Sequence, residues 1–225
     1  MVFMTQRTDD EIRQLLTEKL YVAVISDILD SLGYRNQAMH QRLRPVHKYY
    51  SFAGRARTML SKNVYTADDP DPYGIEIACM DDLKPGDVIV HSTDAELRTA
   101  PWGELMSTAA VQRGAVGAVV DSNVRDVKFI EKIKFPVFAA GIRPLDSNGR
   151  SKVVDYDVAI ECGGILVHPG EWIFADYDGV IAIPKEAEGE VFAKAEEKVH
   201  GENITRDELL QGKLMGEVYA KYGIL

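Results

Sequence analysis

The sequence has little cysteine and no long apolar run. Cys79 and Cys162 are the two cysteines among 225 residues, and neither has metal-ligand spacing around it. We therefore expect reduced core thiols in a cytosolic protein, not a disulfide or a zinc site. The longest apolar run falls far short of the ~18 residues that a membrane helix needs. Residues 1–10 also lack the sustained apolar core of a signal peptide, so we expect a soluble cytoplasmic chain with no membrane partner.

Positive charge is also scarce. Lys and Arg number 26 against 35 Asp and Glu, which gives a net charge of -9. Nucleic-acid surfaces depend on clustered Lys and Arg, so this balance argues against a nucleic-acid partner. The sequence has no nucleophile elbow, phosphate-binding loop, dinucleotide fingerprint or zinc-ligand pair. The histidines are scattered and are expected to be surface or packed residues: His40, His47, His91, His168 and His200.

What is present is the pattern of an α/β protein. Thr8 to Glu11 forms a capping box, and the helix that it starts continues to Leu20. A second helix over 22–32 ends at Gly33, with Ser26 or Asp27 as its expected cap.

Strands and helices then alternate along the chain. We expect strands at 52–60, 88–91, 114–120 and 136–140 and helices at 74–80, 104–113 and 127–133, with a polar turn at Ser122-Asn123. Four short strands without intervening helices follow at 153–160, 165–167, 172–175 and 180–183, which indicates an added β-rich layer. Helix is expected over 186–201 and, interrupted, over 204–222. The sequence thus predicts one domain over 1–225, with N-terminal helices in 1–33 and a C-terminal helical tail in 186–225. The basic segment 34–50 is either a solvated face or a rim around an anionic substrate.

Residues 100–126 carry the strongest indication of a site. Pro101 and Gly103 form a turn before a helix whose first amide groups lack intrahelical partners. Gly103 allows a carboxylate or phosphate to approach those amides closely. Arg125 adds a planar fork suited to a carboxylate. In an open α/β sheet, such junctions at the carboxyl ends of strands are where ligands bind.

Glu104 and Asp126 provide two hard oxygen donors beside this anion site. Mg²⁺ and Mn²⁺ suit such a pair, because they keep several waters and use one or two carboxylates. The alternative is that Arg125 and Asp126 form a salt-bridged helix start. Spacing alone does not decide between the two.

A family resemblance favours the anion and metal site over the salt-bridged helix start. Gly103-Glu104-Leu105, the following Gly-rich strand and Asp121-x-x-x-Arg125-Asp126 resemble the signature of the RraA-like family, in which twenty residues separate an acidic residue from Arg-Asp. This family includes metal-dependent 4-hydroxy-4-methyl-2-oxoglutarate / 4-carboxy-4-hydroxy-2-oxoadipate aldolases. Other matching segments lie at 26–33, 54–58, 85–88, 135–138 and 175–180, so the resemblance covers most of the chain.

The resemblance implies a compact layered α/β/β fold, like swivelling phosphohistidine domains, with N- and C-terminal helices. It implies a homotrimer or homohexamer with sites between subunits. Asp126 would bind Mg²⁺ or Mn²⁺ directly, and Glu104 would orient a metal-bound water that acts as acid or base. Arg125 and the amides of Leu105 and Met106 would hold the pyruvyl carboxylate of the substrate. A C-terminal glutamate of a neighbouring subunit would complete the metal shell through water. Glu202 is the candidate, with Glu196 and Glu197 close by.

The activity implied is that of a class II aldolase. It would cleave a 4-hydroxy-2-oxo di- or tricarboxylate to release pyruvate, with oxaloacetate decarboxylation as a side activity. The family also contains non-catalytic regulators that bind ribonuclease E, but those lack the acid after Arg125 and have a shorter C-terminus. A lyase for another 2-oxo acid is a third possibility. The sequence departs from the family pattern at Ser122, where family members commonly carry glycine. Serine adopts positive φ only at a cost, so we expect a remodelled loop if the backbone needs positive φ there.

Overall fold

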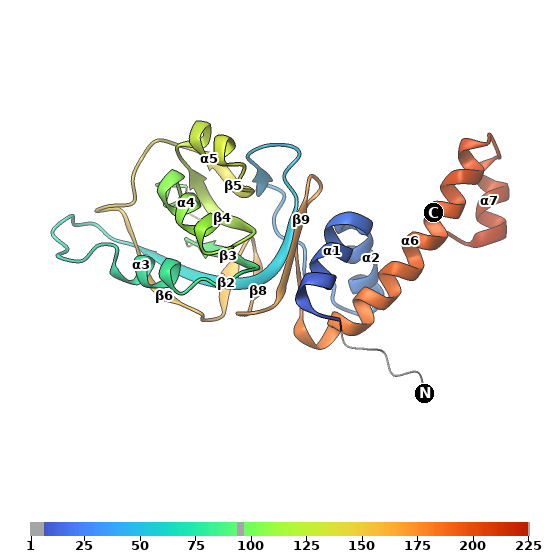
Figure 1. The fold of residues 1–225 in the computed structure, drawn as a ribbon, viewed down its shortest axis with the longest axis horizontal. Coiled ribbons are helices and arrows are strands. Elements are labelled where there is room, and N and C mark those ends of the chain that lie inside the picture. The colour runs from blue at the N-terminus through green and yellow to red at the C-terminus, as the bar shows by residue number, and fades with distance from the viewer. Residues whose placement is uncertain (1–6, 94–96, 225) are drawn as a thin grey trace.

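The computed structural model describes residues 7–93 and 97–224, and a large mixed sheet organises them (Figure 1). The strands are β1 (Arg44–Pro45), β2 (Phe52–Asn63), β3 (Asp87–Ser92), β4 (Gly117–Val124), β5 (Val137–Ile142), β6 (Ser151–Tyr156), β7 (Ile160–Cys162), β8 (Ile165–Val167), β9 (Trp172–Asp176) and β10 (Gly179–Ile183). The helices are α1 (Asp9–Lys19), α2 (Val22–Ser31), α3 (Gly74–Asp81), α4 (Glu104–Gln112), α5 (Val127–Ile133), α6 (Glu188–Leu210) and α7 (Met215–Tyr222).

The sheet order is β1-β5-β4-β3-β2-β9-β10, and β6 also pairs with β2. Strands β2 to β5 form the parallel centre, and β9 and β10 add an antiparallel hairpin. The long β2 pairs with β9 through its first residues and with β6 through its last, with a register shift between Leu60 and Ser61. This switch of partners bends the sheet into a nearly closed, barrel-like form. Gly54 permits close packing in β2, since a Cβ there would lie 2.3 Å from the carbonyl oxygen of Gly86.

Three apolar clusters hold the layers together. One lies between α3, α4, α5 and the outer face of the parallel strands and includes Trp102 and Ile130. The second fills the interior of the sheet, where Phe138 packs edge-on against Phe52 and the β7–β8 hairpin closes one side. The third joins α1, α2 and α6 to β9 and β10. Figure 1 shows the two helical groups at opposite ends of the sheet. This arrangement confirms the expected α/β/β layering, and α1, α2, α6 and α7 are the expected N- and C-terminal helices.

The N-terminal helices confirm one predicted cap and correct another. The Thr8 hydroxyl accepts from the Glu11 amide, and the Glu11 carboxylate accepts from the Thr8 amide at 2.7 Å, which is the expected capping box. Ser26 and Asp27, however, lie inside α2 and do not cap it. Asp176 of β9 does so instead, by accepting from the Val22 amide at 2.9 Å. The cap comes from a residue far away in the sequence, which local spacing does not reveal.

Three other boundaries differ from expectation. The predicted turn at Ser122-Asn123 belongs to β4, which runs to Val124 with a register shift after Val120. The β-rich region has five strands where four were predicted, because residues 153–160 divide into β6 and β7. The helix expected to end at Gly201 continues as α6 to Leu210. Cys79 and Cys162 are free and buried, as predicted.

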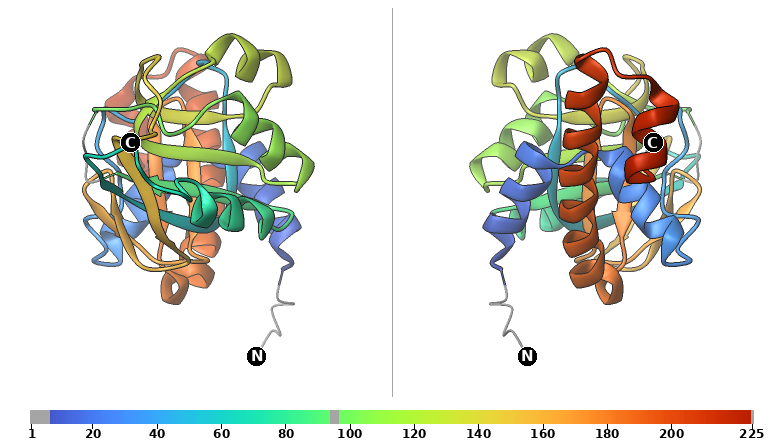
Figure 2. Two further views of the ribbon diagram at one scale, coloured as in Figure 1. Left: turned by 90° about the vertical axis from the view of Figure 1, so that its left-hand side faces the viewer. Right: turned by 90° about the vertical axis from the view of Figure 1, so that its right-hand side faces the viewer.

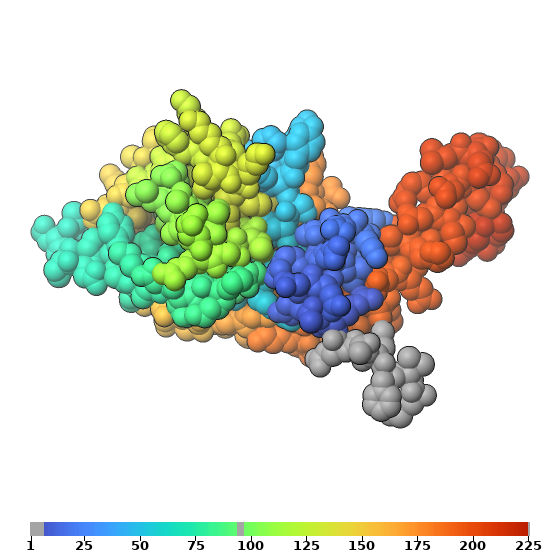
Figure 3. All heavy atoms as spheres, in the orientation of Figure 1, coloured from blue at the N-terminus to red at the C-terminus, as the bar shows by residue number. Residues whose placement is uncertain are grey.

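The C-terminal helices form an arm that projects from the body of the molecule. Figure 2 shows α6 crossing beside α1 and α2, and Figure 3 shows its outer half and α7 standing clear of the other elements. Glu208 joins the two helices by accepting from Lys221 and Tyr222, at 2.9 and 3.0 Å. The hydrogen bond from Lys221 is the main reason that the pKa of Glu208 falls to about 2. Among the described residues, none of the helices has the length and apolar character needed to span a membrane.

Candidate functional site

Two chain segments meet at the carboxyl end of β4 and create the site. The Arg125 amide donates to the carbonyl oxygen of Trp102 at 2.9 Å, and Trp102 forms a parallel bridge with Val124. The Trp102 indole is fully buried and donates to the Ser107 hydroxyl at 2.8 Å. This anchor fixes the start of α4 directly beside the residues that follow β4. The switch from strand to helix therefore occurs twice at one edge of the sheet.

The N-cap residue of α4, Gly103, has no side chain with which to cap the helix, and within the described residues only the amide of Glu104 in this first turn has a carboxylate partner, Asp126 at 3.4 Å. The first amide groups of the helix, including those of Leu105 and Met106, lie in the first turn, where no intrahelical acceptor exists. They carry part of the positive end of the helix dipole and suit an anion. Gly103 precedes them in an extended conformation, and a Cβ on it would lie 2.7 Å from the Asp126 carboxylate. Glycine is needed at this position because the Asp126 carboxylate approaches its Cα closely, and not because the backbone has an unusual φ.

Asp126 has a left-handed backbone, with φ of 59° and ψ of 26°, at the start of α5. Few side chains adopt this conformation, and aspartate is among those that tolerate it best. Its carboxylate does not cap α5 and faces the Glu104 amide instead, at 3.4 Å. The Glu104 carboxylate accepts from the Thr108 hydroxyl at 2.8 Å and stays partly exposed. Both carboxylates therefore lie at one end of α4.

Arg125 lies between two carboxylates. Its Nε is 3.7 Å from Asp126, and its Nη2 is 3.3 Å from Asp146 in the connection between β5 and β6. The Tyr73 hydroxyl donates to the other oxygen of Asp146 at 3.0 Å. The guanidinium remains partly exposed, with 38% of the side chain accessible, so an incoming carboxylate can reach it.

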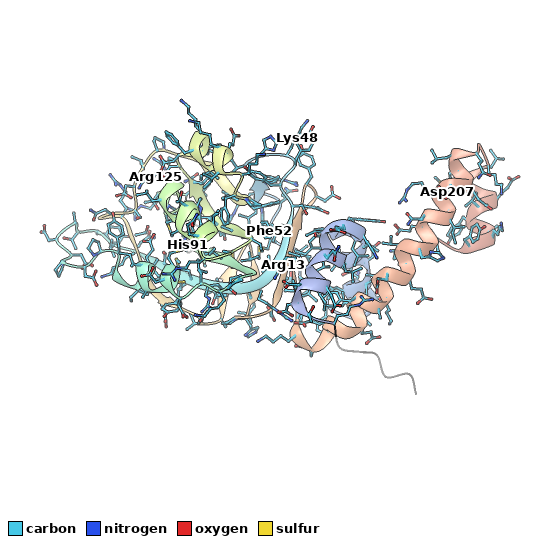
Figure 4. All side chains as sticks on the ribbon, in the orientation of Figure 1. Arg13, Lys48, Phe52, His91, Arg125 and Asp207 are labelled. Carbon is cyan, nitrogen blue, oxygen red and sulfur yellow. The ribbon has the colours of Figure 1, made fainter. Side chains whose placement is uncertain are left out.

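These residues line a pocket of about 450 Å³. Within the part of the chain that the structure describes, the pocket is lined by Tyr73, Glu76, Ile77, Met80, Asp81, Ala100, Pro101, Gly103, Glu104, Leu105, Met106, Ala109, Arg125, Asp126, Asp146 and Ser147. Figure 4 labels Arg125 at the α4–α5 end of the molecule. Burial, reinforced by the nearby charge of Asp146, raises the pKa of Glu76 to about 7, although Arg125 opposes the shift. The pocket thus contains a carboxyl group that changes its charge near neutral pH.

The structure brings together six of the residues selected from the sequence: Gly103, Glu104, Leu105, Met106, Arg125 and Asp126. Glu202 does not join them within the chain. It lies on α6, 3.9 Å from Lys198. Figure 4 labels Asp207, on the same helix, at the opposite end of the molecule from Arg125. Glu202 can therefore reach such a pocket only in another copy of the chain.

Asp121 of the matched motif lies outside this pocket. Its buried carboxylate accepts from Nε and Nη2 of Arg42, at 3.0 and 2.6 Å, and from the Gly163 amide at 2.9 Å. It ties β4 to the basic segment 34–50 and to the β7–β8 turn. Ser122 does not have positive φ, and its hydroxyl donates to the carbonyl oxygen of Thr99 at 3.1 Å. The strained loop considered for Ser122 is therefore absent from this part of the described chain.

Sequence reasoning missed Tyr73, Glu76 and Asp146. Tyr73 and Glu76 belong to the start of α3, and Asp146 belongs to a turn more than sixty residues further along the chain. No spacing links them, because only the packing of α3 against β6 brings the two segments together. The motif of residues 103–126 could not reveal this wall of the pocket.

Comparison with known proteins gives consistent results. The family model described as "RraA-like: Aldolase/RraA" matches residues 22–182. A protein of Halalkalibacterium halodurans named "Putative 4-hydroxy-4-methyl-2-oxoglutarate aldolase" is 31% identical over 195 residues, which cover 87% of this chain and 86% of that protein. The crystal structure of Streptomyces coelicolor RraAS2, described as an unusual member of the RNase ES inhibitor RraA protein family, has 25% identity and a TM-score of 0.79, covering 90% of this chain and 98% of that one. An uncharacterized protein from Pseudomonas syringae, at 22% identity, shares the fold over 99% of both chains with a TM-score of 0.85.

Proposed function

Because the chain belongs to the RraA-like family, we propose that it is a divalent-metal-dependent carbon–carbon lyase that releases pyruvate from a 4-hydroxy-2-oxo acid. The observation that carries the proposal is the meeting of Arg125, Asp126, Glu104 and the uncapped start of α4 in one pocket. A 2-oxo acid presents a carboxylate beside a carbonyl group. The pocket presents a guanidinium and free amides beside two carboxylates, which complement such a substrate.

Arg125 and α4 bind the substrate carboxylate. The guanidinium fork donates two parallel hydrogen bonds to it. The amides of Leu105 and Met106 donate from the positive end of the helix. Asp146 holds Arg125 from the other side at 3.3 Å, so the side chain is oriented before the substrate arrives. The 2-oxo group then lies next to the carboxylates of Asp126 and Glu104.

The donor set suits Mg²⁺ or Mn²⁺. The described residues contain no group of three or more His, Cys, Asp or Glu side chains arranged to hold a metal. Asp126 and Glu104 remain as a pair, and Mg²⁺ commonly uses one or two carboxylates and several waters. Asp126 would bind the ion directly, and Glu104 would act through water. When bound, the ion supplies a Lewis acid for the 2-oxo group.

Glu104 acts as the acid–base group of the proposed reaction. It accepts the proton of the C4 hydroxyl, directly or through a water. The C4–O bond becomes a carbonyl, the C3–C4 bond breaks, and its electron pair forms the enolate of pyruvate. Arg125 and the α4 amides stabilise the negative charge. Return of a proton to C3 gives pyruvate. Oxaloacetate loses CO₂ through the same enolate, so oxaloacetate decarboxylation is proposed as a second activity.

A homotrimer or homohexamer is part of the proposal. Glu202 does not line the pocket of its own chain, and it belongs to α6, whose outer half projects from the body of the molecule (Figure 3). A neighbouring copy can place this arm beside the pocket, where Glu202 would act on the metal through water. Light scattering should therefore give three or six times the chain mass, and Glu202→Gln should lower metal affinity without changing that mass.

The likeness to RraAS2 supports a second candidate, a protein-binding regulator of a ribonuclease. A regulator of this kind would not need the carboxylates of Asp126 and Glu104. The test is pyruvate formation from 4-hydroxy-2-oxo acids and from oxaloacetate, with Mg²⁺ or Mn²⁺ and then with EDTA. Metal-dependent release that is lost in Asp126→Ala supports the lyase. Absence of release from every substrate, together with binding to a ribonuclease, supports the regulator.

A further inference from the structure

The proposed acid–base residue, Glu104, is held by a second residue of its own helix. Its amide donates to the Asp126 carboxylate at 3.4 Å, and its carboxylate accepts through Oε1 from the Thr108 hydroxyl at 2.8 Å. Thr108 lies one turn further along α4, so the two side chains are neighbours on one face of the helix. Glu104 is therefore fixed through its backbone and through its side chain.

The acceptor that Thr108 uses is unusual for a hydroxyl inside a helix. Such hydroxyls ordinarily donate to a backbone carbonyl oxygen in the preceding turn. Thr17 in α1, Ser31 in α2 and Ser107 in α4 do so, at 2.9, 2.7 and 2.9 Å. Thr108 donates to the carboxylate of Glu104 instead. This contact therefore satisfies no backbone group, and its effect is to hold the Glu104 side chain.

The contact between Thr108 and Glu104 does not require another copy of the chain. Both residues belong to α4, so the helix alone brings their side chains together. Figure 1 shows α4 beside α5, at the end of the molecule where the proposed site lies. A neighbouring copy that completes the pocket would therefore meet a Glu104 side chain that its own helix has already oriented.

The orientation of Glu104 matters for the proton transfer of the proposed reaction. A general base must lie within hydrogen-bond reach of the proton that it accepts. Glu104 is partly exposed, and a long side chain in such a position samples several rotamers unless a contact holds it. The Thr108 hydroxyl engages Oε1, which leaves Oε2 for the proton of the C4 hydroxyl or of an intervening water. Once Glu104 is protonated on Oε2, Oε1 remains an acceptor and keeps the contact.

We propose that Thr108 is a positioning residue of the lyase, which holds Glu104 so that Oε2 accepts the proton of the C4 hydroxyl. The inference rests on the proposed function and adds a residue to it. Thr108 is not among the described residues that line the pocket, so it acts through Glu104 and not on the substrate. Its hydroxyl neither gains nor loses a proton in the reaction.

Thr108→Val tests this role, because valine keeps the branched shape of threonine and lacks the hydroxyl. We expect kcat for cleavage of 4-hydroxy-4-methyl-2-oxoglutarate to fall about tenfold, with KM changed less than about twofold. Decarboxylation of oxaloacetate needs no base at a C4 hydroxyl, so its kcat should fall less than about threefold. Equal losses in the two reactions, or full cleavage activity in Thr108→Val, would overturn the proposal.

Two control variants separate the hydroxyl from other effects of the substitution. Thr108→Ser restores the hydroxyl without the methyl group and should keep kcat for cleavage within about threefold of the parent value. Thr17→Val removes an exposed helix hydroxyl of the ordinary kind, in α1, and should leave kcat unchanged. A loss in Thr108→Ser as large as that in Thr108→Val would overturn the proposal, because the methyl group would then be the part that matters.

A double-mutant cycle tests whether Thr108 acts through Glu104. Glu104→Gln should lower kcat for cleavage at least about 100-fold. Adding Thr108→Val to it should cost no more than about another twofold, because the base that Thr108 positions is already absent. A further loss of about tenfold in the double variant would mean that the two residues act independently, and it would overturn the proposal.

A measurement without turnover separates this inference from the proposed function. Carbon-13 relaxation of labelled glutamate side chains, with the Glu104 signal assigned from Glu104→Gln, reports how mobile the Glu104 side chain is. We expect greater mobility in Thr108→Val and the parent mobility in Thr108→Ser. Unchanged mobility in Thr108→Val would overturn the inference while the lyase stands. If the parent protein does not cleave the aldol substrate, the lyase assignment fails, and the relaxation data still decide whether Thr108 holds Glu104.

Discussion

Gly103→Ala should impair the site with little effect on the fold. The added Cβ would lie 2.7 Å from the Asp126 carboxylate, 0.7 Å short of the 3.4 Å at which ordinary contact begins, and 3.2 Å from Cγ of Arg125. The backbone of Gly103 is extended, so alanine is acceptable there. The carboxylate must therefore move by several tenths of an ångström, and Arg125 must adjust with it. Misplacement of reacting groups by ~1 Å can cost ~10²-fold in rate, so we expect kcat/KM to fall about 10- to 100-fold.

The stability of Gly103→Ala should change by less than about 1 kcal/mol, because the atom that yields is the end of a flexible side chain. Gly189→Ala is the matched control. Gly189 lies in α6, and a Cβ there meets nothing within 4 Å. It should retain full activity and gain up to ~1 kcal/mol. Steady-state kinetics and urea unfolding of the two variants provide the comparison. Full activity in Gly103→Ala would refute the close approach of Asp126 to the start of α4.

Three further predictions concern Asp126, Asp121 and Glu76. Asp126→Ala should lower turnover more than about 100-fold in the pyruvate assay while the protein stays folded, and a loss below tenfold would exclude it as the metal ligand. Asp121→Ala should lower the free energy of unfolding by about 3–5 kcal/mol, since it leaves Arg42 and the Gly163 amide without their buried partner. A loss below 1 kcal/mol in urea would contradict that role. The folded-state pKa of Glu76, about 7, exceeds its ordinary value of 4.5, so the native state binds the extra proton. Stability should then decline as pH rises from about 4.5 to 7. Glu76→Gln should flatten this part of the profile, and an unchanged slope would count against the shift.

The sequence was sufficient for those features that depend on neighbouring residues. The capping box of Thr8 and Glu11 and the start of α5 follow from local spacing. The approach of Glu104 to Asp126 follows from the rule that junctions at the carboxyl ends of parallel strands share one edge. The family resemblance correctly implied the α/β/β layering, and the roles that it implies for these residues remain proposals.

Other features depend on contacts between distant segments and were not predictable. Ser122 and Asn123 have the composition of a turn, yet they are buried in β4, where Ser122 donates to Thr99 and Asn123 donates to Leu97 and Thr99. Asp176 caps α2 from across the fold. Tyr73 and Glu76 lie beside Asp146 only because α3 packs against β6. In each case a polar group is satisfied by a partner that no local pattern identifies.

Isotope exchange in pyruvate tests whether Arg125, Asp126 and Glu104 stabilise the pyruvate enolate with a divalent ion. Pyruvate in D₂O exchanges its methyl protons only if the enolate forms, and proton NMR follows the loss of the signal. We expect rapid exchange with Mg²⁺ or Mn²⁺, and a return to the rate of protein-free solution with EDTA or in Asp126→Ala. This result would not depend on knowing the natural aldol substrate. Exchange no faster than in protein-free solution, or exchange that persists in EDTA, would contradict the claim.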